Sequence, residues 1–317
     1  MSDPKDPSNL NGFLASGHNP DLKMQLELAI ERQPERDRNF HLGGRSFYFF
    51  DFDDNIAFLA TPLVVFHKES KQELFISSGE WATHHTAIGN HGPYRDYSMV
   101  YDDEDGGSFR YFRDRHPEEL IRLGVQDQPF LRDLTDAMGL PDLQWKGPSW
   151  SCFYHATFNQ RPISLITARG HEPETLKKGI RLFVEKRLLP MEPNYLSIFP
   201  VSNPQTRKLL GDHEGKLNSA QLKQKAIRAS VEKALETYGY SAHHRFGMSD
   251  DDPRNIELIV DEMTRLKADY PEMSFFMIET HGGDFVKHEI TLRGITSERI
   301  PSPVNPMLLS EQLTLIK

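Results

Sequence analysis

The chain has 317 residues, and 37 Lys and Arg against 46 Asp and Glu give it a formal net charge of −9 at pH 7. Nucleic-acid binding relies on clustered Lys and Arg that displace counterions from phosphates. The sequence has no long basic run, so a nucleic-acid partner is not expected. Hydrophobic residues make up 38% of the chain and aromatic residues 10%, enough for one large or two smaller domains, which excludes full disorder.

Cysteine content and hydropathy bear on the cellular compartment. The only cysteine, Cys152, cannot form an internal disulfide or a cysteine-based zinc site, as is usual in a reducing compartment. No apolar run approaches the roughly 18 residues that span a bilayer, and the first residues are polar rather than a signal-peptide core. We therefore expect a soluble, cytoplasmic protein with no membrane partner, and the sequence leaves its oligomeric state open.

The first half of the chain has a mixed pattern. An amphipathic helix is predicted after Pro20, with Leu22, Leu26 and Ile30 on its apolar face. The aromatic run Ser46–Phe50 has the pattern of a central strand of a parallel sheet. Further predicted elements are a hairpin at 61–66 and 73–77 and short helices at 118–123 and 130–138.

Strands and helices alternate regularly in the second half. We predict strands at 163–166, 195–200, 243–248 and 274–278, and helices at 172–188, 220–238 and 253–269. Ser219 is the expected N-cap of the second of these helices. This alternation predicts an α/β fold with a doubly wound parallel sheet.

The spacing of the strands also predicts the domain organisation. Between Asp51 and Thr167 lie 167 − 51 = 116 positions, more than a simple crossover needs, so we expect an inserted mixed α/β subdomain. The predicted parts are a lead-in and helix (1–44), an α/β core (45–67 and 159–290), the insertion (68–158) and a C-terminal tail (291–317).

Carboxylates follow two of the predicted strands. Asp51-Phe52-Asp53-Asp54-Asn55 follows the first strand, and Asp250 and Asp251 follow a strand 250 − 51 = 199 positions later. Parallel α/β sheets bind ligands at the carboxyl ends of their strands, and carboxylates gathered there repel one another unless a cation is bound. Oxygen ligands suit Mg²⁺, so the sequence predicts a magnesium site, with one carboxylate available to attack and another to move protons.

Four motifs, in this order, resemble those of the haloacid dehalogenase-like hydrolases. The first is an apolar strand followed by Asp-x-Asp, here Phe47–Phe50 and Asp51-Phe52-Asp53. The second is a strand ending in Thr or Ser, here Ile163–Thr167. The third is a Lys near the start of a helix, here Lys223, and the fourth is an acidic pair after another strand, here Asp250-Asp251. The matched region, 47–255, covers about two thirds of the chain.

The resemblance implies a role for each matched residue. Asp51 would attack phosphorus and ligate Mg²⁺, and Asp53 would protonate the leaving group, activate water and meet the metal through its backbone carbonyl. Thr167 would bind the phosphoryl oxygens and Lys223 would offset charge, although Lys225, about 200° round the helix, stays open as the motif lysine. Asp250 and Asp251 would be metal ligands. Arg169 and Asn55 would bind substrate, and at the position of Asn55 the family often has Thr.

The function that the resemblance implies is Mg²⁺-dependent phosphatase activity on a phosphorylated small molecule, through an aspartyl-phosphate. The insertion would be a cap that closes over the site. Asp53 favours phosphate esters over carbon–halogen bonds, because the dehalogenating branch lacks that carboxylate. Alternatives are a non-catalytic protein of this fold that binds a phospho-ligand or a metal, and a metal-dependent glycosyltransferase using Asp-x-Asp, which would leave Thr167, Asp250 and Asp251 without a role.

Overall fold

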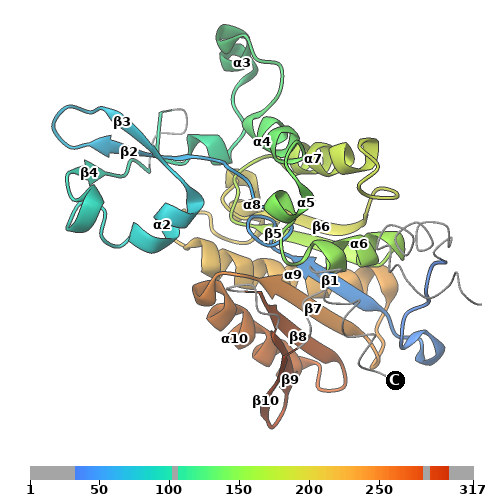
Figure 1. Ribbon diagram of the computed structural model, residues 1–317. Coiled ribbons are helices and arrows are strands. Elements are labelled where there is room, and N and C mark those ends of the chain that lie inside the picture. Colours follow the sequence, from blue (N-terminus) through green and yellow to red (C-terminus); the bar gives the residue numbers. More distant parts are fainter. Residues whose placement is uncertain (1–32, 102–105, 281–285, 300–317) are drawn as a thin grey trace, which may run out of the picture. The chain divides into compact units, whose positions relative to one another are not determined.

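The computed structural model describes residues 33–101, 106–280 and 286–299. The chain divides into two compact units, residues 1–35 and 36–317, and every element named below belongs to the second. Two sheets organise this unit, one with the strand order β10-β9-β8-β7-β1-β5-β6 and a smaller one with the order β3-β2-β4 (Figure 1). The helix predicted after Pro20 lies outside the described residues.

The centre of the large sheet is β1 (Ser46–Phe50), between β5 (Pro162–Thr167) and β7 (Arg245–Asp250). Both of these pairs are parallel, as are β5 with β6 (Asn194–Pro200) and β7 with β8 (Ser274–Glu279). The prediction of an α/β fold with a mostly parallel sheet is therefore confirmed. The chain adds β5 and β6 on one side of β1, then β7 and β8 on the other, so the strand order reverses at β1, where ligands of such sheets bind.

Helices pack on both faces of the large sheet. Side chains of a strand alternate between the faces, so Phe47 and Phe49 pack in one cluster with α9 (Ser219–Tyr238) and α10 (Pro253–Asp269). Phe50 packs in a second cluster with α4 (Pro129–Ala137), α6 (Trp150–Phe158) and α7 (Pro173–Glu185). Each of the three phenylalanines is about 1% exposed, and burying such a side chain contributes roughly 1.5–3 kcal/mol.

The start of α9 differs from the prediction. Its N-cap is Asn218 rather than Ser219, which is the first residue of the helix. Asn218 Oδ1 accepts a hydrogen bond from the Gln221 amide at 2.9 Å, and Gln221 Oε1 accepts one from the Asn218 amide at 3.0 Å. This reciprocal capping box fixes the first turns of α9, which carry Lys223.

The predicted insertion, 68–158, consists of two structurally different parts. The first, together with residues 63–67 that precede it, has a core of its own around Leu63, Ile76 and Tyr94 and forms the small antiparallel sheet that stands beside the large one (Figure 1). The second, with α4 and α6, packs into the cluster on the large sheet. The elements of the insertion and its flanks not given above are β2 (Leu63–His67), β3 (Glu73–Ile76), α2 (Ser78–His84), η3 (Gly92–Tyr94), β4 (Tyr97–Ser98), η4 (Arg110–Phe112), α3 (Pro117–Leu123) and α5 (Asp142–Trp145).

The N-terminal end of the insertion differs from the prediction. The strand β2 was assigned to the α/β core (45–67), but it pairs with β3 and β4 in the small sheet. Two short elements lie outside the insertion, η2 (Phe40–Leu42) and α8 (Pro204–Leu209).

Two antiparallel strands extend the large sheet past its parallel part. They are β9 (Val286–Thr291), which pairs with β8, and β10 (Gly294–Arg299), which pairs with β9. No strand was predicted after β8, and 291–317 was predicted to be a tail, but residues 294–299 of that range form β10. No helix of the described ranges is both long and apolar enough to cross a membrane.

Candidate functional site

Two buried carboxylates meet at the carboxyl ends of β1 and β7. Asp51 follows β1 directly, and its amide donates to the Ser249 carbonyl at 3.1 Å, which continues the strand pairing into the site. Asp250 is the last residue of β7 and is fully buried. Carboxylate oxygens of Asp51, Asp250 and Asp251 lie within 4.8 Å of one another. The structure thus brings together three of the four residues that were predicted to ligate a metal.

Lys223 of α9 lies between the two buried carboxylates. Its Nζ donates to Asp250 Oδ2 at 2.6 Å and lies 3.2 Å from Asp51 Oδ2, and its side chain is 1% exposed. Lys225, the alternative from the sequence, is exposed. Between the two candidates, α9 therefore brings Lys223 to the carboxylates.

Burial and crowding perturb these acidic groups in the same direction. Burial raises the pKa of Asp51 well above its usual range, with Asp250, Asp251 and Asp53 adding to the shift and Lys223 opposing it. Burial, with Asp250 and Asp54 beside it, raises the pKa of Asp251 to about 7. Burial of Asp54 next to Asp53 likewise raises the pKa of Asp54 to about 6. Without a bound cation, protonation of these carboxyl groups is therefore favoured.

The residues present fit a divalent cation. Three ionised carboxylates against one ammonium leave 3 − 1 = 2 negative charges. Within the described structure, Asp51 Oδ1 is buried and has no hydrogen-bond partner, which is costly unless another ligand takes its lone pairs. An all-oxygen donor set of this kind suits Mg²⁺. Asp51, Asp250 and Asp251 are the residues that would hold it.

The side chain of Asp53 is not among the grouped carboxylates and pairs with Arg169. Arg169 Nε donates to both Asp53 oxygens, at 3.1 and 2.9 Å, and Nη2 donates to Asp53 Oδ1 at 2.6 Å and to Thr61 Oγ1 at 2.8 Å. The Asp53 side chain is 26% exposed, whereas that of Arg169 is completely buried. Asp53 can therefore be reached from solvent, and Arg169 cannot.

Thr167 and Asn55 are buried beside the carboxylates. Thr167 ends β5, and its Oγ1 accepts a hydrogen bond from the Arg169 amide at 3.3 Å. Asn55 accepts from Ser249 Oγ at 3.0 Å and donates to Thr280 Oγ1 at 3.3 Å, so both ends of its amide are engaged by the ends of β7 and β8. Asn55, predicted to bind substrate, thus ties the loop after β1 to the edge of the sheet.

Some contributors were not singled out from the sequence. Asn255 Nδ2 and the Asp252 amide each donate to Asp250 Oδ1 at 3.1 Å. Thr280, directly after β8, donates to the Asp250 carbonyl at 3.3 Å. The rule that polar groups after parallel strands meet at one edge would have found Thr280 had it also been applied to β8.

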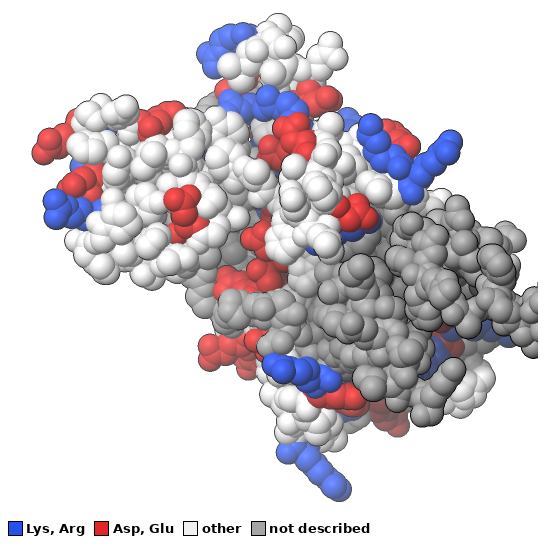
Figure 2. Space-filling model, in the orientation of Figure 1, with Lys and Arg blue, Asp and Glu red and all other residues white. Residues whose placement is uncertain are grey.

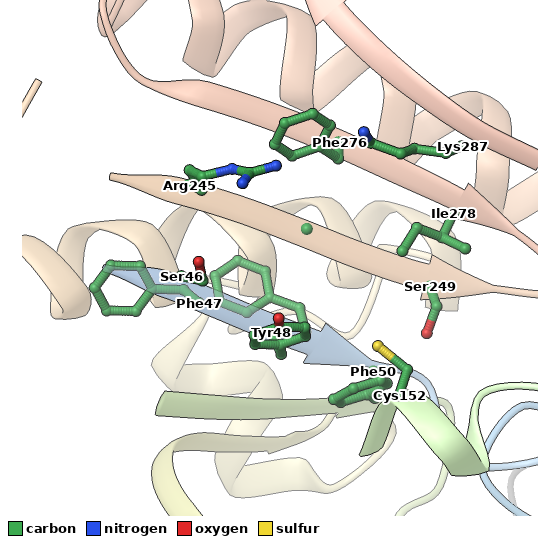
Figure 3. A pocket seen from close by; sticks show the side chains of 12 residues that line it. Ser46, Phe47, Tyr48, Phe50, Cys152, Arg245, Ser249, Phe276, Ile278 and Lys287 are labelled. Atoms are coloured by element: carbon green, nitrogen blue, oxygen red, sulfur yellow. The ribbon is translucent and has the colours of Figure 1, made fainter. Parts of the chain in front are cut away.

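A cavity of about 170 Å³ lies on the sheet face opposite α9 and α10. Figure 3 shows Tyr48 and Cys152 on one side of it, and Arg245 and Lys287 on either side of Phe276. The described residues that line it include none of the grouped carboxylates, so it is separate from the acidic site. Figure 2 shows acidic side chains in the recess between the part with the small sheet and the part with the large sheet.

Comparison with protein-family models, with curated proteins and with solved structures found no match. The function of this chain is therefore inferred from the geometry of the site.

His171, on the loop between β5 and α7, gives a prediction for acid stability. It is fully buried, and within the described structure neither ring nitrogen has a hydrogen-bond partner. Burial, with Arg169 and Arg113 nearby, holds its pKa well below the usual value. Below pH about 6.5 the unfolded chain takes up a proton here that the folded chain refuses, so stability present above that pH is lost on acidification. The expected loss is about 1.4 kcal/mol of unfolding free energy per pH unit.

Denaturant titrations at pH 7.5 and 5.5 would measure this effect, comparing His171→Leu with the native chain. The loss on acidification is expected to be smaller in His171→Leu. His213→Leu, which changes an exposed histidine, is the matched control and should keep the native pH dependence. An identical pH dependence in the native chain and His171→Leu would contradict the prediction.

Proposed function

We propose that the chain is a Mg²⁺-dependent phosphatase of the haloacid dehalogenase-like type that acts on a phosphorylated small molecule through an aspartyl-phosphate. The observation that carries the proposal is the meeting of Asp51 with Lys223 and Asp250, the nearer of which lies 223 − 51 = 172 positions later in the sequence. An isolated Asp-x-Asp turn would not require a buried lysine between its first carboxylate and another strand end. The order of the four motifs adds support.

The described residues suggest how the reaction would run. Asp51 attacks phosphorus, the bond to the leaving oxygen breaks, and Asp53 gives that oxygen a proton. Water then attacks the aspartyl-phosphate, gives its proton to Asp53, and releases phosphate while Asp51 regains its carboxylate. Lys223, 3.2 Å from Asp51 Oδ2, offsets the negative charge that builds up in both steps. Bound Mg²⁺ would neutralise charge on the phosphoryl oxygens.

The geometry bears on the glycosyltransferase alternative. An Asp-x-Asp sequence that holds a nucleotide-sugar through a metal needs its carboxylates at that metal. Here the Asp53 side chain lies on Arg169, and Asp51 is grouped with Asp250 and Asp251 instead. This arrangement favours the phosphatase.

The proposal predicts metal-dependent release of phosphate. A nitrophenyl phosphate and a panel of phosphorylated metabolites should be turned over in millimolar Mg²⁺, because without a cation the crowded carboxylates repel a phosphate. EDTA should abolish turnover, and excess Mg²⁺ should restore it. Turnover that survives EDTA would contradict the proposal. A thermal shift with Mg²⁺ and beryllium fluoride but no turnover on any substrate would favour the non-catalytic alternative.

A further inference from the structure

The environment of Arg169 is that of an enclosed residue rather than a substrate-binding one. Its side chain is completely buried, and its guanidinium lies over the rings of Phe112 and Phe130, 5.0 and 4.8 Å from their centroids. Nε and Nη2 are both engaged, by Asp53 and Thr61. Within the described structure Nη1 is buried without a hydrogen-bond partner, and because the side chain is completely enclosed, a substrate could reach it only if the residues around it moved.

Two residues of the insertion, Phe112 and Asp114, accept hydrogen bonds from residues of the loop that carries Arg169 and of the start of α7. The Gly170 amide donates to the Phe112 carbonyl at 2.7 Å. A side chain at Gly170 would place its Cβ 3.6 Å from Arg113 Cβ and 3.3 Å from the Ser202 carbonyl oxygen. Asp114 Oδ2 accepts from the Glu172 amide at 3.0 Å and from Thr175 Oγ1 at 2.7 Å. The segment 112–114 therefore fastens the loop between β5 and α7 and fixes the base of the Arg169 side chain.

We propose that Arg169 is a positioning residue that orients the Asp53 carboxylate for proton transfer, and that it does not bind substrate. This role rests on the proposed function. Asp53 lies on the half-buried turn after β1, and its partly exposed side chain would otherwise choose among several rotamers. Three N–H contacts from a rigid, buried fork restrict it to one orientation. In that orientation the protonated carboxyl group would give its proton to the leaving oxygen, and the carboxylate that results would take one from water.

Loss of proton transfer and loss of substrate binding have different kinetic effects. A misplaced proton donor slows the reaction most when the leaving group is a poor one, such as an alkoxide, and least when it departs readily as a nitrophenolate. Loss of a phosphate contact instead raises KM, similarly for every phosphate ester. The ratio of kcat for an alkyl phosphate to kcat for a nitrophenyl phosphate therefore separates the two roles.

The test uses Arg169→Lys and Arg169→Ala in the full chain. Lysine keeps the charge but cannot reproduce the fork, so kcat on the alkyl phosphate should fall on the order of 10²-fold. We expect a fall at least tenfold smaller on the nitrophenyl phosphate and little change in KM. Added guanidinium should restore part of kcat in Arg169→Ala only. Arg207→Ala, which removes the ion pair between Arg207 of α8 and Asp212 after that helix, is the control and should behave as the native chain.

Each outcome is decisive, given circular dichroism and a Mg²⁺ thermal shift showing that the variants fold and keep the metal site. Equal losses of kcat on both substrates would overturn the positioning role, as would native kinetics. A rise in KM alone would identify Arg169 as a substrate contact. If the native chain turns over no phosphate ester, the proposed function fails and the positioning role fails with it. If the native chain is active but the Arg169 variants keep the native ratio of kcat on the alkyl phosphate to kcat on the nitrophenyl phosphate, the proposed function stands and the positioning role fails.

Discussion

Asp51→Asn is expected to abolish turnover, lowering kcat on the order of 10⁴-fold or more. An amide cannot attack phosphorus as a carboxylate does, and it replaces one of the three grouped carboxylates by a neutral side chain, which is a weaker ligand for a divalent cation. Released phosphate measures the loss, and trapping with hydroxylamine, which cleaves an aspartyl-phosphate, shows whether the covalent intermediate forms.

The matched control for this change is Asp54→Asn, three residues along the same turn. Asp54 has a φ of 55°, a left-handed conformation that asparagine adopts readily, and it is not among the grouped ligands. The kcat of Asp54→Asn should stay within about tenfold of that of the native chain, because the change removes only a negative charge near the grouped carboxylates. Mg²⁺ should raise the melting temperature of Asp54→Asn and have little effect on Asp51→Asn. A trapped phosphoenzyme in Asp51→Asn would rule out Asp51 as the nucleophile.

The sequence predicts the sheet and its acidic edge because both depend on local rules. The strand Ser46–Phe50 is apolar on both faces, which indicates a central parallel strand, and the structure places β1 at the middle of the sheet. Groups that follow neighbouring parallel strands meet at one edge, so Asp51 and Asp250 come together across 199 positions (250 − 51 = 199). Helical spacing indicates that Lys223 and Lys225 point in different directions. Only the position of α9 over the sheet shows that Lys223 is the one that reaches the carboxylates.

Other features depend on contacts that no local pattern reveals. The Arg169 side chain was as compatible with substrate binding as with an internal ion pair, and only its burial under Phe112 and Phe130 distinguishes the two. The sequence of the insertion does not show that it consists of two parts. An amphipathic helix such as α4 would have the same pattern on either sheet, and the structure packs it on the large one. The strands β9 and β10 were missed because polar residues dominate both, as suits an exposed edge hairpin.

Lys223→Met is expected to lower both stability and activity by large amounts. Removing the ammonium leaves Asp51 and Asp250 buried together without their cation, and breaking a buried ion pair costs about 3–5 kcal/mol. Metal that binds the same carboxylates should offset part of this cost, so the loss of unfolding free energy should be smaller in Mg²⁺ than in EDTA. Activity should fall on the order of 10²- to 10³-fold, as when one donor to a developing negative charge is removed.

The control, Lys225→Met, makes the same chemical change two residues along α9 at an exposed position, where stability should stay within about 0.5 kcal/mol of the native chain. Denaturant titrations of both variants with and without Mg²⁺, together with released phosphate, make the comparison. Equal effects of the two substitutions would contradict the assignment of Lys223 to the site. A Lys223→Met variant that loses activity but keeps full stability in EDTA would show that the ammonium acts on the substrate alone, and that Asp51 and Asp250 do not depend on it when no metal is bound.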